Sequence, residues 1–155
     1  MKKAKRTAVW LIAVVFFSAC AIAGYFNWRP VKVIDVHAGK YSQSIIVDHL
    51  PLAARLKIAW WLKNQSALTK KYRLSTPADG NFYNISVWQF GDGYKELGKY
   101  DRFCFDDMPP PNNCIEKERL MYITLTRDGE VSYWLNDTRY VQKANGELNE
   151  TGWDN

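Results

Sequence analysis

The side chains that most often perform chemistry are sparse in this chain and match no catalytic motif. His37 lies in a strand-like segment and His49 precedes a helix-like one, and neither accompanies a plausible nucleophile. We interpret both as surface or capping histidines. Asp106 and Asp107, with Glu116, lack the regular oxygen-ligand spacing and central glycine of a calcium loop, so we expect them to be solvated. The sequence therefore predicts no catalytic residue, no metal site and no cofactor.

Polar segments of the chain are better suited to recognition than to chemistry. Residues 91–96 lack the Lys-Ser/Thr sequence of a phosphate-binding loop, and we expect a tight turn there after an aromatic strand. Asp106 and Asp107 follow in a loop with three prolines. Loops held on a rigid scaffold often bind partners, because little ordering entropy is lost on association. The candidate partner-binding residues are Trp60, Asp92, Tyr94, Lys95, Glu96, Asp106 and Asp107.

The N-terminal segment, residues 1–28, predicts a membrane anchor. Four basic residues within positions 2–6 precede an uncharged run over residues 7–26. Twenty helical residues rise about 30 Å, which is roughly the thickness of the bilayer hydrocarbon. Because lipid cannot satisfy backbone polar groups, the run should be helical. The basic start favours the cytoplasmic side, so we expect everything after Trp28 to face outward.

Two alternatives to a retained anchor remain open. Ala21-Ile22-Ala23 before Gly24 resembles the cleavage site of a signal peptide. Phe17-Ser18-Ala19-Cys20 approximates the box before a lipidated cysteine, although the chain stays apolar beyond Cys20. An apolar run longer than a normal signal core favours the retained anchor, with Tyr25, Trp28 and Arg29 at the membrane interface.

Cys104 and Cys114 are predicted to form a disulfide bond. They are the two cysteines outside the membrane segment, and a short polar loop separates them in a part of the chain expected to be exported. Closing an eleven-residue loop should stabilise the fold by about 2.8 kcal/mol on the chain-entropy model. Two cysteines are too few for a zinc site, and a bonded Cys104 has no thiolate to act as a nucleophile.

The hydrophobic pattern after the anchor predicts one α+β domain over residues 29–143. Strands are expected at 31–37 and 44–47 as a hairpin, at 82–90, 102–105, 119–126, 131–135 after the Asp128-Gly129 turn, and 139–143. A helix is expected from Pro51 to Tyr72, with Ile58, Trp61, Leu62, Leu68 and Tyr72 on one face. Trp60 falls roughly opposite that face, where it either binds a partner or packs on a second layer. Residues 144–155 are predicted to be a flexible polar tail. The fold class is thus a small antiparallel sheet packed against one long helix.

The charge balance argues against nucleic-acid binding. The formal net charge is +5, but the four basic residues of the N-terminus belong to the topology signal. They leave 17 Lys and Arg of the total 21 against 16 Asp and Glu in the rest of the chain. A nucleic-acid-binding domain would need a basic stripe on its folded part.

Several ordered segments resemble the enterobacterial family known as domain of unknown function 943. They are Arg29–Val33, Trp60–Asn64, Phe90–Glu96, Lys99–Asp107 and Cys114–Lys117. The resemblance extends from the anchor to about Tyr140, and the acidic, Asn-rich tail looks peculiar to this sequence.

The resemblance implies a single-pass inner-membrane protein with its domain in the periplasm. Some family members resemble immunity proteins against type VI secretion effectors that act on peptidoglycan. The expected partner is therefore a cognate effector toxin, which the protein would bind and occlude without chemistry. The alternative is a structural or accessory subunit of an envelope complex. Small residues at four-residue spacing are sparse in the membrane segment until Ala19 and Ala23, which argues against tight helix packing there.

Overall fold

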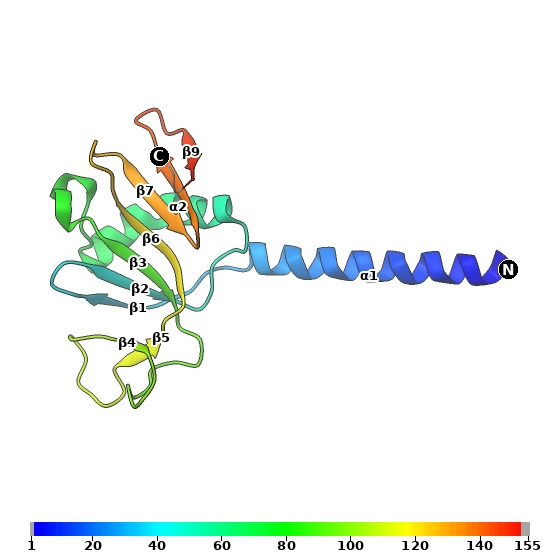
Figure 1. Cartoon of the computed structure of the whole chain (residues 1–155), viewed down its shortest axis with the longest axis horizontal. Helices are drawn as coiled ribbons and strands as arrows, with labels where there is room; N and C mark the ends of the chain where they lie inside the picture. Colours follow the sequence, from blue (N-terminus) through cyan, green and yellow to red (C-terminus); the bar gives the residue numbers. More distant parts are fainter. Residues whose placement is uncertain (1, 153–155) are drawn as a thin grey trace.

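The computed structural model describes residues 2–152 and joins a long N-terminal helix to an α+β domain (Figure 1). The helices are α1 (Lys2–Trp28), α2 (Ala54–Tyr72) and the short 3-10 helix η1 (Pro77–Phe82). The strands are β1 (Val33–Ala38), β2 (Gln43–Val47), β3 (Ile85–Gln89), β4 (Arg102–Cys104), β5 (Cys114–Glu116), β6 (Arg119–Leu125), β7 (Val131–Leu135), β8 (Thr138–Gln142) and β9 (Leu148–Thr151). The α+β class predicted from the sequence is confirmed.

Helix α1 projects away from the domain (Figure 1). Its stretch from Trp10 to Trp28, 19 residues, is long and apolar enough to cross a membrane. The side chains described along it are mostly exposed, as expected of a helix whose apolar surface has no protein to cover it. The sequence predicted a span over residues 7–26. In the structure the C-terminal end of the apolar stretch is Trp28, two residues later than predicted.

The main sheet has the strand order β1-β2-β3-β6-β7-β8-β9 among the described residues. Neighbouring strands run antiparallel, in agreement with the prediction, except that β2 and β3 are parallel. Helix α2 lies between β2 and β3 in sequence and makes the crossover that a parallel pair needs. The predicted hairpins β1–β2 and β6–β7 are both present.

Helix α2 begins three residues later than predicted. Ala53 still has an extended backbone, and the first helical residue is Ala54. The helix ends at Tyr72, as predicted, because Arg73 adopts a left-handed conformation with φ of 56°. Ile58, Trp61 and Leu68 are buried against the sheet.

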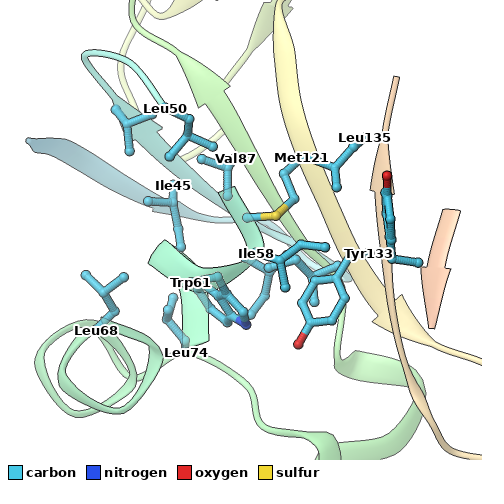
Figure 2. Packing of buried hydrophobic residues seen from close by; sticks show 14 of the residues in the cluster. Ile45, Leu50, Ile58, Trp61, Leu68, Leu74, Val87, Met121, Tyr133 and Leu135 are labelled. Atoms are coloured by element: carbon cyan, nitrogen blue, oxygen red, sulfur yellow. The ribbon is translucent and has the colours of Figure 1, made fainter. Parts of the chain in front are cut away.

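The large core fills the space between α2 and one face of the sheet (Figure 2). Alternate residues of the central strands point into it, including Ile45, Val87 and Met121. Leu62, Tyr72 and Trp60 pack against this core from the half-buried positions of α2. The predicted apolar face of the helix is therefore confirmed. Trp60, which the sequence placed roughly opposite that face, also packs against the core.

The C-terminal segment differs from the predicted polar tail. Residues 148–151 form β9, which pairs antiparallel with β8. The hydrogen bonds of this ladder come from the backbone, so a polar strand can form without an apolar pattern in its sequence. Gly146, with φ of 84°, supplies the turn between the two strands. Residues 153–155 of the predicted tail lie outside the described residues.

Candidate functional site

Residues 90–116, which we call the lobe, lie between β3 and β6 and cover part of the second face of the sheet. Strands β4 and β5 form a separate antiparallel pair within it (Figure 1). A second apolar cluster joins the lobe to the sheet: Ile46 and Trp88 come from the sheet, and Phe105 and Ile115 come from the lobe. Phe103 stacks on Trp88 with ring centroids 4.5 Å apart. The lobe is therefore packed on the sheet face opposite α2.

The predicted disulfide between Cys104 and Cys114 is present and links β4 to β5. A backbone bridge next to it holds the turn at residues 91–96. Lys95 N donates to Cys114 O at 2.7 Å, and Cys114 N donates to Lys95 O at 3.0 Å. The turn and the disulfide loop are thus parts of one braced unit, although they are separate in sequence.

His37 forms the contact between the lobe and the edge strand β1. Its Nδ1 lies 2.9 Å from Asp107 Oδ1, and its Nε2 lies 2.7 Å from the Tyr94 hydroxyl. The Tyr94 hydroxyl donates in turn to Asp35 Oδ2 at 3.1 Å. The imidazole also stacks on Phe105 with a centroid distance of 3.9 Å. We call His37, Asp35, Tyr94 and Asp107 the histidine latch.

The latch corrects the interpretation of His37 as a surface or capping residue. His37 is 5% exposed. Tyr94 has one hydroxyl proton, and when it donates to Asp35 it must accept from His37. Since both nitrogens bind groups of the fold, His37 positions the lobe and has no nitrogen directed at a substrate.

Burial is the main reason why the pKa of the Tyr94 hydroxyl is raised above its ordinary value, and the Asp35 carboxylate beside it adds to the shift. The phenol therefore stays protonated and keeps donating to Asp35. Asp107 contributes a further contact, because its Oδ2 accepts a hydrogen bond from Ala38 N at 3.2 Å. The latch thus fixes both the turn and the disulfide loop to β1.

The outer surface of the lobe has an ion-pair network. Lys95 Nζ lies 3.1 Å from Asp92 Oδ2 and 3.2 Å from Glu116 Oε1, and Arg102 Nε donates to Glu116 Oε1 at 3.0 Å. The hydrogen bonds from Arg102, and then from Lys95, hold the pKa of Glu116 below its ordinary value. The network leaves Glu96, Tyr100 and Leu97 exposed beside it.

A hollow of about 260 Å³ lies between the lobe and the β1–β2 turn. Its lining includes the latch residues His37 and Asp107, together with Asp106, Lys40 and Tyr41. The hollow is small and has a mixed polar and apolar lining, so it is a depression next to the lobe, with the size of a site for one protruding side chain.

The structure brings six of the seven sequence-predicted contacts onto the lobe. Asp92, Glu96 and Asp106 are exposed there, and Lys95 is half-buried in the ion-pair network. Tyr94 and Asp107 also belong to the latch. Trp60 is not part of the lobe: it packs half-buried against the core on the α2 side.

Sequence reasoning missed Asp35, His37 and Arg102. A signal for the first two was present, because Asp35 and His37 are alternate residues of one strand and must point to the same face. A repeated polar residue on one face of an otherwise apolar strand marks a polar cluster on that face. Nothing local marked Asp107 as their partner, 70 residues away.

In the part of the chain that the structure describes, one helix is long and apolar enough to span a membrane, and it precedes a disulfide-braced α+β domain. Residues 2–151 match the family described as "Enterobacterial putative membrane protein (DUF943)", and the chain belongs to that family. The match includes residues 141–151, which therefore are not peculiar to this sequence. No curated protein and no solved structure matches the chain.

Proposed function

We propose that this chain is a membrane-anchored periplasmic immunity protein, which binds and occludes a peptidoglycan-targeting toxin of a type VI secretion system. The observation that best supports a binding role is the lobe, because it unites both predicted recognition segments on one cross-linked unit. Its surface combines exposed Tyr100 and Leu97 with the charged side chains of Asp92 and Glu96. Tyrosine is typical of the centre of a protein interface, and polar or charged residues are typical of its rim.

Inhibition in this proposal is steric. The disulfide, the Lys95–Cys114 bridge and the histidine latch hold the lobe in place before the toxin arrives. Binding then costs little ordering entropy, which raises affinity for a given set of contacts. The exposed charges would set the orientation of the complex and select against wrong partners. The membrane anchor would keep the inhibitor in the compartment where the wall is attacked.

The lobe is tested by reversing its charges. We expect the double variant Glu96→Arg/Asp106→Arg to weaken binding of the toxin encoded next to this gene by at least about tenfold, equivalent to 1.4 kcal/mol. Asp128→Arg/Asp137→Arg is the matched control, because it reverses the same number of charges at exposed acids in the β6–β7 and β7–β8 turns, outside the lobe. Equal weakening by both changes would point to net charge and would reject the lobe as the binding surface.

The role itself is tested in cells. Deleting the gene should make cells sensitive to attack by sibling cells, and the purified chain should capture the product of the neighbouring gene. If the neighbour is no toxin and sensitivity is unchanged, the immunity proposal fails. The outward orientation has its own test: a reporter at the C-terminus that works only outside the cytosol should be active.

The alternative, an accessory subunit of an envelope complex, predicts a different result when the anchor is exchanged. Replacing residues 2–26 with an unrelated membrane helix leaves Asn27 and the whole domain unchanged. Immunity should survive this exchange, because only the location of the domain matters. A subunit that uses α1 as part of its interface would lose its function.

A further inference from the structure

The junction between α1 and the domain is held by side chains at the membrane end of the domain. Asn27 donates from Nδ2 to Ala23 O at 2.9 Å, which fixes its amide against the helix. Its Oδ1 accepts from Leu52 N at 2.8 Å and from Ala53 N at 3.3 Å. The last turn of α1 is thereby joined to the segment that precedes α2.

Arg29 adds a second set of contacts at the same junction. Its Nη2 lies 3.6 Å from Asp48 Oδ2, and its Nε donates to His49 Nε2 at 3.3 Å. The guanidinium also lies 6.0 Å from the centre of the Tyr25 ring. With Asn27 and Arg29 both engaged, α1 has a defined direction relative to the sheet.

These contacts determine how far Leu52 lies from the end of the candidate membrane span. Asn27 is the second-last residue of the stretch that can cross a membrane, and the Leu52 amide lies within hydrogen-bond distance of it. The headgroup region is about 5–8 Å thick on each side of the hydrocarbon. When α1 spans a bilayer, Leu52 must therefore lie at the level of the headgroups.

The exposed side chains at this end suit that environment. Trp28 is 86% exposed, Leu52 is 64% exposed and Leu56, in the first turn of α2, is 41% exposed. Lys32 and Arg55 are exposed beside them. The acid at this end is Asp48, which lies 3.6 Å from Arg29 and accepts a hydrogen bond from Lys32 N. Among the described residues, the side chains of Lys32 and Arg55 form no ion pair. Tryptophan belongs at membrane interfaces, and basic side chains are attracted to anionic lipids.

We propose that Trp28, Leu52 and Leu56, with Lys32 and Arg55, form a membrane seat that rests on the phospholipid surface around α1. The apolar side chains enter the headgroup layer and the basic ones lie among the lipid phosphates. The domain is then fixed by two adjoining contacts, the span and the seat, so that one end of it always faces the bilayer. The β1–β2 turn lies at the opposite end of the domain from α1 (Figure 1).

The test uses the full chain in lipid nanodiscs, one copy per disc. Cys20→Ser removes the free thiol, and an environment-sensitive fluorophore is attached at Leu52→Cys or at Tyr41→Cys. The two positions are matched, because Leu52 is 64% exposed and Tyr41 is 62% exposed, but Tyr41 lies in the distant β1–β2 turn. Lipids with a quencher high on the acyl chain report contact with the bilayer.

We expect the label at 52 to emit at shorter wavelength than the label at 41. The quencher should remove most of the emission of the label at 52 and leave the emission of the label at 41 unchanged. Discs that contain phosphatidylglycerol should quench the label at 52 more than discs of phosphatidylcholine alone. Equal quenching at 52 and 41 would overturn the proposal. It would also be overturned if the label at 52 changed only when two chains share a disc, because the patch would then bind a second copy. None of these outcomes depends on a toxin.

Discussion

His37 is the residue on which the attachment of the lobe depends most. It joins three separate parts of the chain, namely β1, the 91–96 turn and the disulfide loop. A buried polar group that loses its partner costs about 1–3 kcal/mol. The imidazole also stacks on Phe105, so its removal takes a hydrogen-bond partner from both Tyr94 and Asp107 and leaves a gap over an aromatic ring.

We therefore expect His37→Ala to lower the free energy of unfolding by about 1–3 kcal/mol. Urea denaturation of the purified protein measures this directly. Lys40→Ala is the control, because Lys40 is an exposed residue of the same hairpin. Equal losses in the two variants would show that the latch contributes nothing beyond the hairpin itself.

The raised pKa of Tyr94 leads us to expect that the protein loses stability at alkaline pH. Its pKa is raised in the folded state, mainly by burial, so its contribution is fully present below the unfolded value of about 10. Above that pH the unfolded chain releases the proton and the folded chain keeps it, so stability falls as pH rises. Tyr94→Phe should make the fall of unfolding free energy between pH 9 and pH 12 less steep. If Tyr94→Phe altered the free energy of unfolding by the same amount at every pH, this explanation would be contradicted.

At the scale of elements, the disulfide determines whether β4 and β5 stay paired. These strands have three residues each, and two such strands are marginal without a cross-link. We expect the double variant Cys104→Ser/Cys114→Ser to lose about 2.8 kcal/mol of stability on the chain-entropy model. Chemical denaturation measures the loss, with Cys20→Ser as the control outside the domain. An unchanged midpoint would mean that the histidine latch, the Lys95–Cys114 backbone bridge and the packing on Trp88 hold the lobe without the cross-link.

The elements also show why sequence reasoning succeeded in some places and not in others. The α2 helix was predictable because Ile58, Trp61 and Leu68 repeat at helical spacing, which is a local pattern. The parallel pairing of β2 with β3 was not, since it depends on where α2 returns the chain and not on the residues of either strand. Strand β9 is polar, and its pairing uses backbone groups that every sequence has.

In the candidate site, too, local features could be predicted from the sequence and tertiary contacts could not. The turn and the disulfide loop were predicted one by one, from the glycines and from the two cysteines. Their union through Lys95 and Cys114 is a tertiary contact without a local signal. The burial of His37 depends in the same way on Tyr94 and Asp107, which are 57 and 70 residues away.

At the scale of the whole molecule, the junction joins α1 and the domain into one body. We expect Asn27→Ala to loosen it, because the amides of Leu52 and Ala53 lose the acceptor that joins them to α1. A fluorophore at Tyr41→Cys in nanodiscs should then show lower steady-state anisotropy, as the domain gains independent motion. Ser18→Ala, within α1 and distant from the junction, is the control. Unchanged anisotropy in the Asn27 variant would mean that Arg29 alone is sufficient.

The connection between α1 and β1 also limits how far the protein can reach. Residues 29–32 are the whole of that connection, and four extended residues cover at most about 14 Å. With α1 in a bilayer, the domain cannot search the space above the membrane as a protein on a long tether does. Any ligand that it captures must come within one domain's height of the lipid. The protein would therefore bind only ligands in a thin layer next to the membrane, and none elsewhere in the compartment.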